Sequence, residues 1–209
     1  AGHKALRWAH PALLVALVNP LSPERSIMRP SLVPGLLEVL ATNVHRQRPD
    51  VRVFETGVTF APHREHDGDW PMHEELWLGV ALTGQRAARA WHASRERVDL
   101  YDAKGMAELV LATAGVTGAV TEPWPAGEEP GYLEPGRAAR FLVDGAEIAR
   151  FGEVAHRARE VSDLTAPVFV AEVSLSALVA PAPAVPRFVP LPRFPAVQRD
   201  LALVVGDEV

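Results

Sequence analysis

A proline-rich stretch near the C-terminal end limits how this chain can fold. Residues 180–195, APAPAVPRFVPLPRFP, hold six of the 19 prolines. Proline fixes φ and lacks a backbone N–H, so the stretch cannot form a helix or a central strand. It predicts a semi-rigid linker that follows a body, residues 1–180, and opens a tail, residues 181–209. Residues 201–205 predict a new strand with no element after it, so we expect a fragment of a longer protein.

Two segments of the body show helical periodicity. Residues 31–47 predict a helix, in which Leu36 and Leu40 have helical spacing. Ser31 is its expected N-cap, and a proline beyond residue 47 ends it. Residues 99–115 predict a second helix that begins at an aspartate and ends at a glycine.

Alternating apolar residues predict the strands. They occur in residues 51–60, 74–83 and 168–175, and in residues 139–154, where Asp-Gly marks a hairpin turn. Residues 176–179 predict a short turn or helix. Strands and helices without strict alternation favour an α+β fold, an antiparallel sheet flanked by helices.

Charge and cysteine usage restrict the function. A net charge of −5 and a pI of about 5.9 argue against a generally basic surface for nucleic acid, but not against a local basic patch. No cysteine is present, which excludes disulfides and thiolate metal sites and fits the cytoplasm. The apolar run at residues 12–18 is too short to span a bilayer, and no small-residue cleavage site follows it, so neither a membrane partner nor a signal peptide is expected.

Motifs for chemistry are weak. One loop concentrates possible metal ligands, but their spacing matches no closed motif, and a solvated loop is favoured over a metal site. These ligands are His63, Glu65, His66, Asp67, Asp69 and His73. No glycine-rich phosphate loop and no G-x-S-x-G motif occurs. Carboxylates within the strands are expected to be paired or solvent-facing; they are Glu55, Glu153 and Glu172.

The proline-rich stretch and the tail interleave cations with aromatic rings. Stacking plus phosphate contact by such residues is typical of an RNA platform. A linker whose rings pack on a neighbouring domain is the preferred interpretation. The residues are Arg187, Phe188, Arg193, Phe194, Gln198 and Arg199.

Several segments together resemble one family. NPLSPERSIMRPSLVPGLLEVLATNVHRQ, VRVFETGVTF, DAKGMAELVL, PGRAARFLVDGAEIARFGEV and RFPAVQRDLALVVGDEV, in this order, resemble the C-terminal half of the bacterial phenylalanyl-tRNA synthetase beta subunit. The resemblance covers nearly the whole chain. It implies a heterotetramer of two alpha and two beta subunits, in which alpha carries the class II active site that activates phenylalanine with ATP and charges tRNA(Phe).

The resemblance also implies two domains here. Residues 1–180 would be a class II synthetase-type domain without activity. Residues 181–209 would be the linker and the truncated start of a ferredoxin-like anticodon-binding domain. ATP and magnesium would belong to the whole enzyme, with no cofactor in this chain.

The first active-site motif of class II enzymes is incomplete. An F-E-x-G strand in active enzymes leads to an aromatic residue and Arg-x-Glu, whose arginine grips the α-phosphate of ATP. Here Phe54, Glu55 and Gly57 are kept, but Ala61 and His63 stand at the arginine and glutamate positions.

The second motif has changed as well. In active enzymes a G-x-G-x-x-R-L segment lets the backbone approach adenine and holds the γ-phosphate. Glu172 and Ser174 replace the glycines here, and Ala177 replaces the arginine. A glutamate facing a triphosphate would repel it, so we expect no productive ATP binding.

These expectations combine into a non-catalytic scaffold that packs on the alpha subunit and helps to position tRNA. Leu36, Leu40, Arg46 and Arg48 are the candidate interface residues, with plain intradomain packing as the open alternative. Arg187, Arg193 and Arg199 are the candidate tRNA-side residues. Two other functions stay open: a nucleotide-binding enzyme with a divergent site in the loop at residues 63–73, and a stand-alone RNA-binding module.

Overall fold

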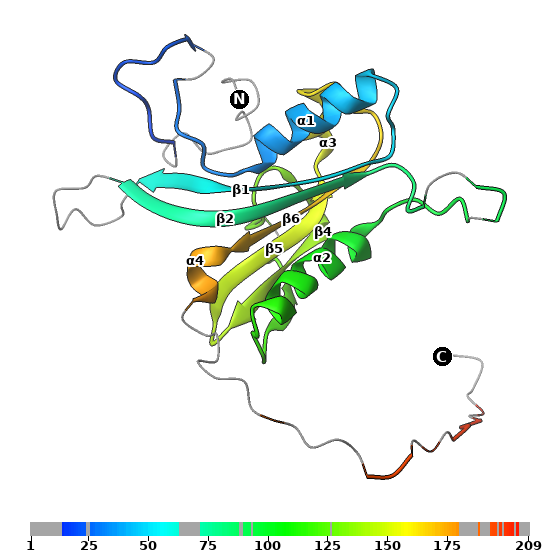
Figure 1. Ribbon diagram of the computed structural model, residues 1–209. Helices are drawn as coiled ribbons and strands as arrows, with labels where there is room; N and C mark the ends of the chain where they lie inside the picture. The colour runs from blue at the N-terminus through cyan, green and yellow to red at the C-terminus, as the bar shows by residue number, and fades with distance from the viewer. Residues whose placement is uncertain are drawn as a thin grey trace.

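The body is an antiparallel sheet with helices on both faces (Figure 1). The computed structural model describes residues 14–23, 26–62, 72–87, 90–92, 94–125, 127–179, 188, 193–195, 197, 199–202 and 204. The six strands are β1 (Val51–Pro62), β2 (Met72–Thr83), β3 (Val120–Pro123), β4 (Leu133–Val143), β5 (Ala146–Val154) and β6 (Val168–Ser174), in the order β1-β2-β6-β5-β4-β3. The helices are α1 (Val33–His45), α2 (Leu100–Thr113), α3 (His156–Glu160) and α4 (Leu175–Leu178). The predicted α+β class is confirmed.

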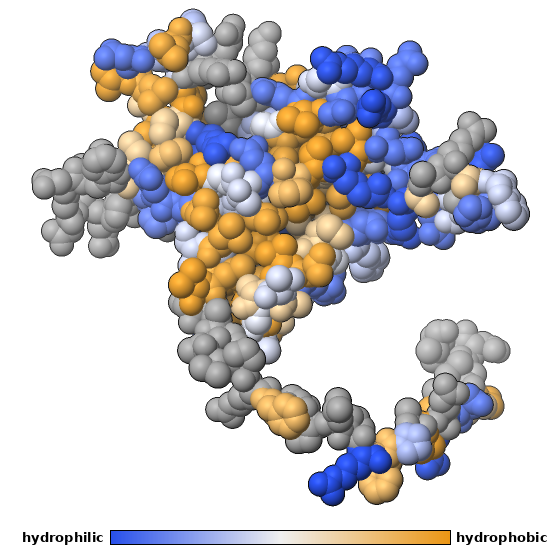
Figure 2. Space-filling view, in the orientation of Figure 1, coloured by the Kyte–Doolittle hydropathy of each residue, from blue (hydrophilic) through white to orange (hydrophobic). Residues whose placement is uncertain are grey.

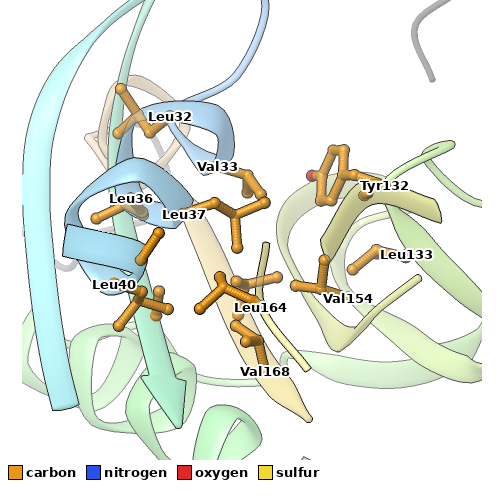
Figure 3. Close-up of a cluster of buried hydrophobic side chains, with 14 of the residues drawn as sticks. Leu32, Val33, Leu36, Leu37, Leu40, Tyr132, Leu133, Val154, Leu164 and Val168 are labelled. Atoms are coloured by element: carbon orange, nitrogen blue, oxygen red, sulfur yellow. The ribbon is translucent and has the colours of Figure 1, made fainter. Parts of the chain in front are cut away.

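Helix α1 covers one face of the sheet (Figure 1). Leu36 and Leu40 point into a core that also holds Leu164 and Val168 (Figure 3). The close approach of helix and sheet depends on Gly79 of β2, because a Cβ there would lie 2.9 Å from Leu36 Cδ1. The helical spacing of the leucines thus buries one stripe of α1 against the sheet.

Helix α2 covers the opposite face. Its small inward residues Ala103 and Ala107 let it lie close to the strands, and Leu111 completes the buried stripe. The aromatic side chains under it come from three neighbouring strands: Phe141, Phe151 and Phe169. Two separate apolar clusters therefore hold the sheet, one on each face.

Helix α2 begins with a capping box. The Asp99 carboxylate accepts hydrogen bonds from the N–H groups of Tyr101 and Asp102, and the Asp102 carboxylate accepts from the N–H of Asp99 at 2.8 Å. Partial burial would raise the pKa of Asp102. The hydrogen bonds from Arg86 and from the Asp99 backbone outweigh it and hold this pKa below its usual value.

We expect Asp102→Ala to lower the free energy of unfolding by about 1–2 kcal/mol at pH 7, through the lost cap. A carboxylate whose pKa is depressed in the folded state adds stability at pH values above its unfolded pKa of about 3.9. This electrostatic contribution is lost as the pH falls through the pKa of the folded state. Urea unfolding of both proteins at several pH values should show a difference that shrinks below about pH 4. Glu108→Ala, an exposed change in the same helix, should cost a few tenths of a kcal/mol. A difference independent of pH would contradict the electrostatic part.

Some predictions were confirmed and others need correction. Asp144 and Gly145 have φ of 50° and 79°, so the predicted hairpin turn is present. Ser31 is not the N-cap of α1, because Leu32 holds that position; the Ser31 hydroxyl instead accepts from the Val33 N–H at 3.0 Å. Strand β3 and helix α3 were not predicted, since neither segment has an apolar period. In the predicted strand at residues 201–205, the described residues 201, 202 and 204 are not in a strand.

Candidate functional site

A pocket of about 220 Å³ opens on the α1 face of the sheet, beyond the N-terminal end of α1. Antiparallel register brings its residues to this face: Ala61 pairs with His73, Thr59 with Glu75, and Glu172 with Arg150. Its lining consists of Pro30, Thr59, Ala61, His73, Glu75, Trp77, Arg150 and Glu172. Two of these positions, Ala61 and Glu172, are those at which the resemblance implies a departure from an active class II site.

Glu172 forms the inner wall of the pocket and is 2% exposed. One carboxylate oxygen accepts from the Ser31 hydroxyl at 2.7 Å and from the Leu32 N–H at 3.0 Å. The other oxygen accepts from the hydroxyl of Tyr132. Burial, reinforced by the Glu172 charge, raises the pKa of Tyr132 well above its usual value although Arg150 opposes the shift, so the phenol stays protonated as the donor. Glu172 therefore ties β6 to the start of α1.

Arg150 is the cation of the pocket. Its guanidinium lies over the Trp77 ring at 4.5 Å, and its Nε is 2.8 Å from Oε1 of Glu147. Burial alone would lower the pKa of Arg150, but Tyr132, Glu172 and Glu147 outweigh it and raise the pKa. Burial also raises the pKa of Glu147, against the effect of nearby arginines. Arg150 is thus engaged by groups of the protein itself.

Glu75 is the second carboxylate of the pocket lining. It accepts a hydrogen bond from the Ser174 hydroxyl, and its other oxygen is 4.0 Å from Nε2 of His73. The lining therefore has one arginine against the two carboxylates Glu75 and Glu172, a charge of −1 with His73 neutral. Such a lining disfavours a polyphosphate.

The candidate interface residues lie in two different environments. Leu36 and Leu40 are 1% and 0% exposed, so they belong to the core and offer no surface to a partner. The expectation that they form an interface is therefore wrong for both, and intradomain packing accounts for their spacing. Arg46 and Arg48, just beyond α1, are exposed, and their role in an interface stays a prediction.

Other predicted sites lie partly outside the described residues. Arg187 and most of the polar loop belong to this group, with only His73 of the loop described. Arg193 and Arg199 are exposed. Among the residues that the structure describes, no group of three or more His, Asp or Glu side chains is placed to hold a metal ion.

The strand carboxylates are paired, as predicted. Glu55 lies 2.6 Å from Arg29, and Glu153 lies 2.5 Å from Arg137. Sequence reasoning missed the roles of Arg150 and Tyr132. The sequence held one signal for Arg150: a charged residue within a strand of mostly small and apolar residues needs a partner when it is buried. In the described part of the chain, no helix is long and apolar enough to cross a membrane.

The fold defines a class of protein. The chain superposes on two structures of pyrrolysyl-tRNA synthetase from Desulfitobacterium hafniense with TM-scores of 0.59 and 0.61, over 85% and 86% of this chain and 58% and 59% of those chains. At 17% identity this likeness shows the fold alone, an antiparallel sheet with helices that this chain shares with an aminoacyl-tRNA synthetase. Residues 3–175 match the family described as "Phenylalanyl tRNA synthetase beta chain CLM domain", and the chain belongs to this family.

Similar relatives carry the corresponding name. The chain is 37% identical over 193 residues to the phenylalanine–tRNA ligase beta subunit of Pseudomonas syringae pv. tomato, which covers 92% of this chain and 23% of the relative. It is 38% identical over 203 residues to that of Xanthomonas campestris pv. campestris, covering 97% and 24%. The chain spans about a quarter of the length of these curated relatives.

Proposed function

We propose that this chain is a non-catalytic scaffold within the beta subunit of phenylalanine–tRNA ligase, the cytoplasmic enzyme that attaches phenylalanine to tRNA(Phe) with ATP. The observation that carries the proposal is the chemistry of the pocket at the position of a class II active site. Ala61 lines this pocket and Glu172 closes its inner wall. By the resemblance, Ala61 and Ala177 hold the positions of phosphate-binding arginines, although Ala177 itself packs against the apolar cluster on the α2 face and not in the pocket. The fold is kept while the groups that would hold a triphosphate are absent.

The partner of the scaffold is the alpha subunit, in a heterotetramer of two alpha and two beta chains. Because Leu36 and Leu40 are buried, the contact surface lies elsewhere. Apolar side chains gather over α4 and the neighbouring ends of β5 and α2 (Figure 2). Leu76 and Val179 are 42% and 79% exposed. An exposed apolar patch of this kind is typical of a surface that another protein covers. Arg46 and Arg48 offer exposed charges at the other end of the body.

The tail follows from the same family membership. It is the linker and the start of a ferredoxin-like anticodon-binding domain, and Arg193 and Arg199 lie on its tRNA side. Magnesium and ATP act in the alpha subunit, and this domain holds no cofactor of its own.

Calorimetric titration tests the scaffold role. We expect the purified chain to give no binding heat with ATP and magnesium, because the pocket lacks groups that hold a triphosphate. We expect clear heat with the alpha subunit, because the exposed apolar surface around α4 can bind a protein partner. The alpha subunit titrated with ATP is the positive control. Micromolar ATP binding by the chain would contradict the proposal and favour a nucleotide-binding enzyme with a divergent site in the loop at residues 63–73.

A further inference from the structure

The connection between β2 and α2 lies at the other end of β2 from α4 (Figure 1). Its strand-like stem is closed by the Arg86 N–H donating to the Glu96 carbonyl at 2.8 Å and the Val98 N–H donating to the Gly84 carbonyl at 3.1 Å. We call the described residues of this connection, 84–87, 90–92 and 94–98, the Trp91 hairpin. It projects away from the sheet (Figure 1).

The base of the hairpin is held firmly. Gly84 has a φ of 90°, and a Cβ there would lie 2.4 Å from the Pro49 carbonyl oxygen, so only glycine fits. The Gln85 N–H donates to the Asp50 carboxylate at 2.6 Å, and Arg52 donates to the Gln85 carbonyl at 3.0 Å. The first strand of the stem is thus fixed by backbone and side-chain contacts to residues 49–52.

One cation of the stem has a structural role. Arg86 lies within 3.1 Å of carboxylate oxygens of Glu96, Asp99 and Asp102. It joins the hairpin to the capping box of α2, and its charge is balanced there. Arg86 is therefore not expected to contact a ligand.

The tip presents an aromatic ring and cations to solvent. Trp91 is 97% exposed, and the His92 ring stands nearly perpendicular to it at 5.2 Å. Arg95 and Arg97 are exposed, and the described residues include no ion-pair partner for either. The surrounding surface is mainly polar (Figure 2). A ring kept in water beside two uncompensated cations, on a polar surface, is not a contiguous apolar patch.

We propose that the Trp91 hairpin is a contact for unpaired RNA, in which one base stacks on the Trp91 ring and Arg95 and Arg97 contact the adjoining phosphates. Stacking needs an open ring face and tolerates any base, and backbone contact needs cations beside it. The local charge is the reverse of the chain's net charge of −5, so an anionic partner would be drawn to this point. The inference rests on the proposed function for the kind of RNA that the hairpin meets, a tRNA.

Fluorescence anisotropy tests the contact with the full chain and a labelled oligouridine strand of about twelve nucleotides. At about 50 mM salt we expect measurable binding that Trp91→Ala weakens about tenfold. The double variant Arg95→Ala/Arg97→Ala should weaken binding and reduce the slope of log K against log salt by about 1.4. A duplex of the same length should bind less well than the single strand, because its bases are already stacked.

Matched controls separate this contact from general effects. Phe54→Ala removes another exposed ring, on β1, and Arg46→Ala/Arg48→Ala removes two exposed cations beyond α1. The ring control should leave oligouridine affinity unchanged, and the charge control should have a smaller effect than the hairpin pair.

Equal affinity of wild type and Trp91→Ala, or no binding by wild type, would overturn the proposal. Loss of alpha-subunit binding in Trp91→Ala with RNA binding intact would overturn it in favour of a protein contact. ATP titration is independent of these outcomes, so the scaffold role is judged separately.

Discussion

Glu172→Ala is expected to lower the free energy of unfolding by about 3–5 kcal/mol, the usual cost of removing one member of a buried charged group. The change leaves the Ser31 hydroxyl, the Leu32 N–H and the Tyr132 hydroxyl without their acceptor. It also removes a carboxylate that offsets the buried charge of Arg150. Urea unfolding followed by circular dichroism measures the effect as a shift of the midpoint.

Two comparisons make the result specific. Glu74→Ala removes an exposed carboxylate from β2 and should change stability by less than about 0.5 kcal/mol. In a double-mutant cycle, Tyr132→Phe should be less damaging in the Glu172→Ala background than in wild type, because its partner has already gone. If Glu172→Ala were as stable as wild type, the carboxylate would not be holding β6 to α1, and its place in the pocket would need another explanation.

Leu40→Ala is expected to destabilise the chain by about 2–5 kcal/mol. Leu40 is 0% exposed in the cluster between α1 and the sheet, so truncation leaves a cavity as well as losing apolar contact. The urea midpoint should fall while the slope stays unchanged, because the surface exposed on unfolding is nearly the same.

The neighbouring residue supplies the control. Val39 lies next to Leu40 in α1 but is 44% exposed, and Val39→Ala should cost less than about 1 kcal/mol. This comparison also tests the corrected view of Leu40. If Leu40→Ala kept full stability but failed to bind the alpha subunit, the leucine would be an interface residue after all.

Features encoded by neighbouring residues could be predicted from the sequence. Asp144-Gly145 defines the turn of the β4–β5 hairpin through backbone conformations that these residues tolerate. Asp99 at the start of α2 is recognisable because a cap bonds to N–H groups two and three residues away. The positions at which the resemblance implies a replacement, Ala61 and Glu172, could also be located in the sequence, since a motif is read along one strand.

Features that depend on distant pairing could not be predicted in this way. Ser31 and Glu172 are 141 positions apart, and Tyr132 is 40 positions from Glu172. Only the strand register places Arg150 beside Glu172, and a one-residue slip would have sent it to the other face. The leucines of α1 were misjudged for a related reason: helical spacing shows that a stripe is apolar, but not whether sheet or partner covers it.

The central position of β6 bears on how the chain folds during synthesis. The β1–β2 and β4–β5 pairs each join neighbouring strands of the sequence, but β6 lies between β2 and β5 and is the last strand of the body to be made. The bond from the Leu76 N–H to the Ser176 hydroxyl spans 100 positions. Pairing over such distances is slow because the loop entropy is lost before the contacts form. Until β6 has left the ribosome, β2 and β5 keep open edges that any other extended chain could occupy, so this interval is when the nascent body is most exposed to aggregation.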